Sequence, residues 1–156
     1  MKKLNRKSQE GFTIIEVMIV LAIAGLIMLI VFMAVPALQR TSRNTQRKND
    51  ASMIVAAINE CLSNHNGYYN YCESVSDSAV VLNTEKLGQL RSVSYGDWTP
   101  VNSTGNVGAS WWFGYQCDNS GTSYVTSGNN RTFMVLYRIE SSSAGGGSGQ
   151  LQCVGA

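Results

Sequence analysis

The residues most able to do chemistry in this sequence are four cysteines and a single histidine. Cys61, His65 and Cys72 lie close together and suggest a zinc site, but their spacing matches no common zinc module. An even number of cysteines indicates disulfides in a chain that lies outside the reducing cytoplasm. We therefore predict disulfides and no metal site.

Three disulfide pairings are possible. We favour Cys61 with Cys72, which would staple a helix end to its loop, and Cys117 with Cys153, which would tie the last strand into a sheet. Each bond would contribute about 2 to 4 kcal/mol, mainly by restricting the unfolded chain.

Catalysis has little support. His65 stands in an Asn-rich turn, so a Ser-His-Asp or Cys-His site would depend on one loop residue. The Gly/Ser-rich tract 141–149 lacks the lysine and the strand-to-helix context of a phosphate-binding loop. We predict no catalytic residue and no cofactor.

A group of aromatic residues offers a different chemistry, stacking on bases or sugars. Such residues more often belong to a core or a subunit interface. The group consists of Trp98, Trp111, Trp112, Phe113 and Tyr115. The tripeptides that begin at Asn102 and Asn130 match the glycosylation acceptor pattern, which is a weak signal.

A long apolar run dominates the start of the chain. At about 1.5 Å per helical residue, residues 12–38 would form a helix of about 40 Å, enough to cross a hydrocarbon layer of about 30 Å. Glu16 is the only ionisable side chain between Phe12 and Gln39. Burying it at membrane depth is costly without a partner. The run predicts a membrane-spanning helix with one charge that needs pairing.

A basic leader, residues 1–11, precedes the run, and its four cations would keep it on the cytoplasmic side. A secretory signal has the same basic start, but its cleavage site follows its apolar core. Residues 22–24 do fit the small-x-small cleavage pattern, yet they lie in the middle of the run. The natural break comes before the core, at Gly11.

The junction between leader and run is a motif in its own right. It consists of Lys7, Gly11, Phe12, Thr13, Ile14, Ile15 and Glu16. Together with the flanking span, the motif resembles the N-terminus of a type IV prepilin. The resemblance covers about the first third of the chain, and it implies that a prepilin peptidase cuts between Gly11 and Phe12 and methylates the new amino group of Phe12.

The resemblance also implies a role for Glu16. After cleavage, the positive amine of Phe12 would lie four residues away, and opposite charges attract strongly in a low dielectric. The pairing, within one subunit or between neighbours, would give the helices a register for stacking. The alternative is that Glu16 only snorkels to the membrane interface.

Gly25 and Pro36 are the helix-weakening residues of the run. Proline removes a backbone donor and usually kinks a helix. We expect a bend near Pro36. By analogy with assembled pili, we expect the segment 25–36 to lose helical structure in a filament.

Charged residues make up 14% of the chain, and the formal charge is +2. Without the leader, eight basic residues face nine acidic ones, a net charge of −1. Nucleic acid is therefore a possible but unsupported partner. Four cations follow the run and could bind phospholipid headgroups or acidic residues of neighbouring subunits, or simply form a solvated helix face. They are Arg40, Arg43, Arg47 and Lys48.

The elements that must position these residues predict an α+β protein, and the resemblance implies that it has a type IV pilin-like fold. We divide the chain into a leader (1–11), a transmembrane or filament-core helix (12–38), an amphipathic second half of the helix (39–65), a connecting loop region (66–108) and an antiparallel sheet of about four strands (109–156). The amphipathic stripe comprises Ile54, Ala57, Ile58, Cys61 and Leu62. Strand candidates are 110–117, 122–126, 132–140 and 150–154. Within the otherwise irregular connecting region, a β-like run at 79–82 and a helical turn at 84–90 are expected.

These features favour a structural pilin subunit that polymerises with itself into a helical pilus. The resemblance implies a peptidase, an assembly platform with a cytoplasmic ATPase, and membrane lipid as partners. It also implies a single-pass precursor with its N-terminus inside, which then reaches the cell surface. The pilus would serve motility, adhesion or DNA uptake. The alternatives are a minor pilin, a type II secretion pseudopilin, or a membrane-anchored binding domain that never polymerises.

Overall fold

The computed structural model describes residues 11–73, 86–90, 92–97, 108–141 and 149–155. The chain divides into two units, residues 1–39 and 40–156, and each is described by itself. The predicted β-like run at 79–82, Trp98 and Asn102 lie outside the described residues, and the predicted helical turn at 84–90 lies partly outside them.

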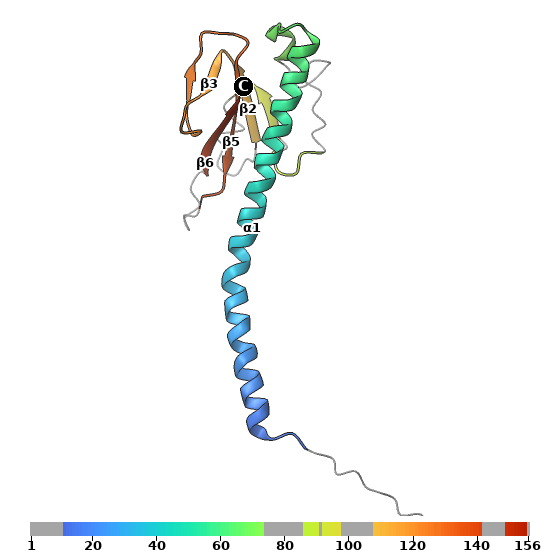
Figure 1. Cartoon of the computed structure of the whole chain (residues 1–156), viewed down its shortest axis with the longest axis vertical. Coiled ribbons are helices and arrows are strands. Elements are labelled where there is room, and N and C mark those ends of the chain that lie inside the picture. Colours follow the sequence, from blue (N-terminus) through green and yellow to red (C-terminus); the bar gives the residue numbers. More distant parts are fainter. Residues whose placement is uncertain (1–10, 74–85, 91, 98–107, 142–148, 156) are drawn as a thin grey trace, which may run out of the picture. The chain divides into compact units, whose positions relative to one another are not determined.

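The dominant element is the helix α1, Ile14–Asn64 (Figure 1). Its first part is long and apolar enough to cross a membrane. The helix is continuous through Gly25 and Pro36, so no break occurs at these residues in the single subunit. Proline removes one hydrogen bond, and the flanking turns of α1 maintain the helix around that gap. Loss of helix between 25 and 36 on assembly stays a prediction.

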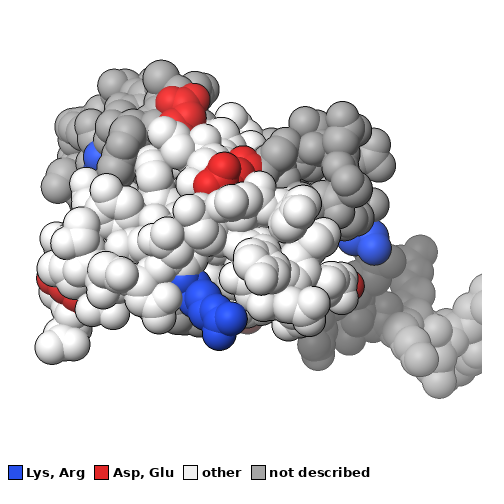
Figure 2. Space-filling model, turned by 90° about the horizontal axis from the view of Figure 1, so that it is seen from above, with Lys and Arg blue, Asp and Glu red and all other residues white. Residues whose placement is uncertain are grey.

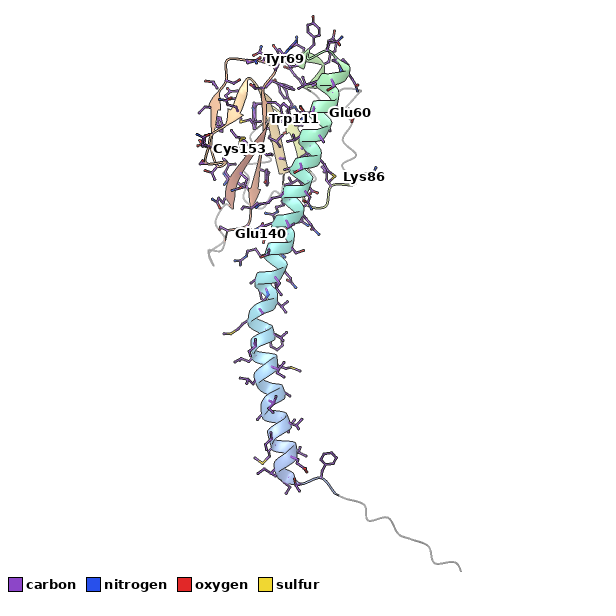
Figure 3. All side chains as sticks on the ribbon, in the orientation of Figure 1. Glu60, Tyr69, Lys86, Trp111, Glu140 and Cys153 are labelled. Atoms are coloured by element: carbon purple, nitrogen blue, oxygen red, sulfur yellow. A yellow bond between two sulfur atoms is a disulfide. The ribbon has the colours of Figure 1, made fainter. Side chains whose placement is uncertain are left out.

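The second part of α1 packs on a sheet. Its buried apolar residues recur every three or four positions, which places them on one face of the helix. Ile54, Ile58 and Cys61 lie in the main core, with Ala57 and Leu62 at its margin, as the predicted stripe requires. The sheet contributes Phe133 and Val135 to the same core. It also contributes Trp111, which is labelled in Figure 3.

The sheet has four strands in the order β1-β2-β5-β6. They are β1 Ser92–Tyr95, β2 Gly108–Phe113, β5 Phe133–Ile139 and β6 Gln150–Gly155. The α+β layout is confirmed, but the prediction of a purely antiparallel sheet is wrong, because β1 runs parallel to β2. The strand β1 comes from the region predicted as loop, where no strand was expected at these residues.

A second, two-stranded sheet pairs β3, Tyr115–Cys117, with β4, Tyr124–Thr126. The prediction of a single strand at 110–117 is therefore wrong, because the segment divides at Gly114 into β2 and β3. Gly114 has a φ of 79°, which a side chain disfavours. Its N–H donates to the Thr132 carbonyl at 2.9 Å, so the turn is held against the segment that leads into β5.

The structure contains the disulfides Cys61–Cys72 and Cys117–Cys153, which are the favoured pairings. The first joins α1 to the short 3-10 helix η1, Tyr69–Cys72, and the second joins β3 to β6. Their sequence separations are 11 and 36 residues. Loop-closure entropy gives contributions of about 3 and 4 kcal/mol, so the second bond restricts the unfolded chain more.

Candidate functional site

The peptide bond between Gly11 and Phe12 lies just before α1, in a segment without regular structure. Gly11 is exposed, and a side chain built on it would meet no atom within 4 Å. Packing within the chain therefore does not explain a glycine at this position. Phe12 is 88% exposed, so the bond that the resemblance assigns to a peptidase is accessible in the subunit.

Glu16 lies in the first turn of α1, three residues after Thr13. Its Oε2 atom accepts hydrogen bonds from the Thr13 backbone N–H at 2.8 Å and from the Thr13 hydroxyl at 2.7 Å. This is half of a capping box, in which an acidic residue satisfies the backbone donor that the helix start leaves unpaired. The T-x-x-E spacing carries that signal, which our sequence analysis missed.

The apolar part of α1 buries none of its large side chains in this subunit. From Ile14 to Leu38 they are exposed, with Phe32 at 76% and Met33 at 77%. A contiguous apolar surface of this extent needs either lipid or other helices around it. Glu16 is the single charge on that surface among the residues described.

The four-cation segment after the run has a different environment from the one predicted. Arg43 donates to both carboxylate oxygens of Glu140, from Nε at 2.8 Å and from an Nη atom at 2.7 Å. Arg47, which is buried, donates to the same carboxylate at 2.9 Å. The amide of Asn44 bonds both backbone groups of Glu140. Two of the four cations, Arg43 and Arg47, thus fasten α1 to the end of β5 within the subunit.

Asp50 fastens the connecting region to α1. Its side chain is 3% exposed and accepts three backbone hydrogen bonds, from Gly88 at 3.0 Å, Gln89 at 2.6 Å and Leu90 at 2.9 Å. Three charge-assisted bonds satisfy a carboxylate that would otherwise be costly to bury. A lone acidic residue on the helix gave no sequence signal for this contact, because its donors are backbone groups.

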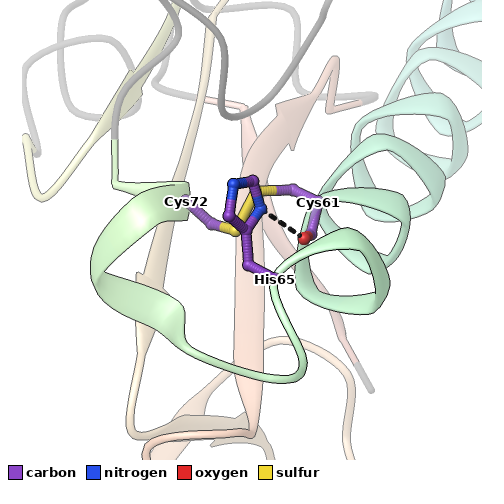
Figure 4. Close-up of side chains that lie close together, drawn as sticks. All are labelled: Cys61, His65 and Cys72. Carbon is purple, nitrogen blue, oxygen red and sulfur yellow. Dashed lines mark hydrogen bonds between the residues drawn. A yellow bond between two sulfur atoms is a disulfide. The ribbon is translucent and has the colours of Figure 1, made fainter.

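The Cys61, His65 and Cys72 group does come together, with ligand atoms within 4.8 Å of one another. Figure 4 shows why it is not a thiolate metal site: the two sulfur atoms are bonded to each other. The Nδ1 atom of His65 donates to the Cys61 carbonyl at 3.0 Å, and its ring stacks on Tyr71. The group closes the C-terminal turn of α1.

The aromatic group is core rather than a stacking surface. Trp111 is fully buried and its Nε1 donates to the Cys72 carbonyl at 3.2 Å. Trp112 and Phe113 are also buried, and Tyr115 packs edge-on against Tyr124. The described members therefore agree with the favoured interpretation, that these aromatics belong to a core, and the alternative of stacking on bases or sugars has no support from them.

The ion pairs of Glu140 with Arg43 and Arg47, here called the clamp at Glu140, predict that the stability of the fold depends on pH. The Arg43 hydrogen bonds, supported by attraction to Arg47, lower the pKa of Glu140 below its usual value of 4.5. A lowered pKa means that the ion pairs of Glu140 stabilise the fold fully above the usual pKa of 4.5. This stabilisation is lost as pH falls through the lowered pKa of the folded chain. We expect the stability difference between the native chain and Glu140→Gln to be constant above about pH 5.5 and to shrink below about pH 4.5.

This difference is measured by urea unfolding in detergent from pH 3 to 7, followed by tryptophan fluorescence. The pKa of Asp118 is also lowered, by its hydrogen bond with Ser120, but that carboxylate titrates in both chains and cancels in the difference. A difference that stays constant down to pH 3 would show that the Glu140 charge does not stabilise the fold.

Comparison with known proteins addresses the helix start. A family model for the prokaryotic N-terminal methylation motif matches residues 6–32. The chain carries the type IV prepilin signature. The prepilin signature includes Gly11, Phe12, Glu16 and Gly25 and ends before Pro36. No curated protein and no solved structure is significantly similar to the chain.

The prepilin signature, together with an apolar helix near the N-terminus, is that of a membrane-anchored precursor that is exported to the cell surface. It points to a structural protein rather than an enzyme, and it implies processing by a peptidase and assembly into pilus-like polymers. The unit formed by residues 40–156 contains both disulfides, and disulfides persist in the oxidising environment outside the cytoplasm.

Proposed function

We propose that the chain is a structural subunit of a type IV pilus. The observation that carries the proposal is the prepilin signature placed directly before an apolar helix whose side chains find no cover in the subunit. Lipid covers this helix in the precursor, and the helices of neighbouring subunits cover it in the filament. The domain formed by residues 40–156 coats the filament.

The proposed assembly begins with cleavage between Gly11 and Phe12 by a prepilin peptidase and methylation of the Phe12 amine. The new amine then lies one residue before Thr13, whose N–H and hydroxyl already bind Glu16. The carboxylate has unused acceptor capacity, since Oε1 takes no part in these two bonds. It can bind the Phe12 amine of an adjacent subunit while it caps its own helix.

An assembly platform driven by a cytoplasmic ATPase would draw the processed subunits out of the membrane. Such a filament can serve motility, adhesion or DNA uptake. No feature of the described residues distinguishes these three uses. A minor pilin or a type II secretion pseudopilin would share the same N-terminus, and an anchored binding domain would share only the span.

Intact mass and N-terminal sequencing of sheared surface material test the proposal. We expect an abundant chain that begins at a methylated Phe12 and contains both disulfides. Gly11→Leu should leave the leader attached and the chain in the membrane, whereas Ser52→Ala, on an exposed part of α1, should behave as the native chain does.

The outcomes separate the alternatives. A processed chain that is a small fraction of the sheared protein would identify a minor pilin. A processed chain confined to the cell envelope would identify a pseudopilin. A chain that keeps Met1 and never leaves the membrane would overturn the proposal in favour of an anchored binding domain.

A further inference from the structure

We propose that a groove around Arg131 binds a sugar that carries a carboxylate. The groove has a volume of about 440 Å³ and is lined by Asn66, Gly67, Tyr68, Tyr69, Asn130 and Arg131. A second groove of about 290 Å³ shares Asn66, Gly67 and Arg131 and continues over the last turn of α1. Arg131 therefore lines both grooves, which together have space for more than one sugar ring.

The guanidinium of Arg131 lies against Gly67. A Cβ built on Gly67 would lie 3.1 Å from Nε, 3.3 Å from Cζ and 3.4 Å from an Nη atom of Arg131, which is tighter than ordinary van der Waals contact. Gly67 has a φ of 82°, which also favours glycine. The backbone N–H of Arg131 donates to the Asn129 side chain at 3.0 Å, which holds the backbone that carries the guanidinium.

Arg131 forms no ion pair with any acidic side chain in the part of the chain that the structure describes. Arg43 and Arg47 bind Glu140, and Arg138 donates to the Gly149 carbonyl at 2.6 Å. In the view of Figure 2, charged side chains are few and scattered among uncharged ones. An arginine without an acidic partner, on a nearly neutral surface, is available to bind a carboxylate through two parallel hydrogen bonds.

The walls of the groove fit a sugar ring. Tyr68 is 65% exposed, and its ring can stack on the apolar face of a sugar. Tyr69 is fixed by its contact with Phe113, with ring centroids 5.7 Å apart, and forms a rigid wall. The amides of Asn66 and Asn130 offer both donors and acceptors to hydroxyl groups. Nucleic acid fits less well, because a phosphate backbone needs several cations and Arg131 is the only cation among the described residues that line the two grooves.

The inference does not rest on polymerisation, since all of these residues belong to the unit 40–156. The test therefore uses the full chain as a monomer in detergent, with trigalacturonate as the probe and its fully methyl-esterified form as the uncharged control. Calorimetric titration should show at least about tenfold tighter binding of the free acid, and Arg131→Gln should remove that preference.

Three further variants sharpen the test. Arg131→Lys keeps the charge but loses the bidentate geometry and should bind several-fold more weakly than the native chain. Tyr68→Ala should weaken the acid and the ester alike. Lys86→Gln removes an exposed charge outside the grooves and should change neither affinity by more than about twofold.

Equal binding of acid and ester, or full binding by Arg131→Gln, would overturn the proposal. An oligothymidylate that binds more tightly than trigalacturonate, in a manner that Arg131→Gln abolishes, would also overturn it by assigning the groove to nucleic acid. Retained native fluorescence of each variant shows that a loss of binding is not a loss of folding.

Discussion

Glu16→Ala should abolish surface filaments while leaving membrane insertion intact. The substitution removes the only charge on the described apolar part of α1 and with it the proposed partner of the Phe12 amine. It also removes a cost of insertion, so the precursor should accumulate in the membrane at native levels or above. Electron microscopy and immunoblotting of sheared and membrane fractions measure both effects.

Glu16→Ala also removes the helix cap, so a second variant is needed to separate the two roles. Glu16→Gln keeps an oxygen that can accept from Thr13 but carries no charge. If the charge sets the register of assembly, Glu16→Gln should fail as Glu16→Ala does. The converse control is Thr13→Val, which removes a hydroxyl donor but keeps the carboxylate, and it should still assemble. Normal filaments from Glu16→Gln would show that capping, not charge, is what assembly requires.

Asp50→Asn should lower the free energy of unfolding by about 3 kcal/mol. The buried carboxylate accepts from Gly88, Gln89 and Leu90, and an asparagine would turn an N–H group toward at least one of these donors. Leu90 is buried, so water does not replace the acceptor that its N–H loses, whereas Gly88 is exposed and Gln89 is half-buried. Urea unfolding of the full chain in detergent, followed by tryptophan fluorescence, gives the value.

The matched control is Ser52→Ala, two residues along the same helix. Ser52 is exposed and donates only to the Lys48 carbonyl of its own helix, so its loss should change stability by less than about 0.5 kcal/mol. If Asp50→Asn were as mild as Ser52→Ala, the contact between the helix and residues 88–90 would not stabilise the folded domain.

The helix was predictable because its signals are local. The apolar run and the stripe through Ile54 and Ile58 placed its limits within two residues of Ile14–Asn64. Both disulfides agree with the favoured pairings, in which Cys61 at the helix end pairs with Cys72 in the following loop and Cys117 pairs with Cys153 between strands. The prepilin motif was recognisable because it combines a sequence pattern with a position before a span.

Other features were not predictable because they depend on contacts between distant segments. The parallel strand β1 has a short and weakly apolar sequence, and only its register with β2 makes it a strand. The three donors to Asp50 lie 38 to 40 residues away and are backbone groups. The proposed site at Arg131 brings this residue against Gly67, which lies 64 positions earlier in the chain. The clamp at Glu140 joins positions almost one hundred residues apart.

The connecting region is attached to the rest of its unit at three described places: the disulfide at Cys72, the hydrogen bonds from residues 88–90 to Asp50, and the pairing of β1 with β2. None of these three attachments uses a residue that lies between it and the next one. Because the entropic cost of a longer loop grows only slowly with length, insertions between these attachments are tolerated. Length changes between these attachments therefore leave the contacts between the helix and the sheet in place.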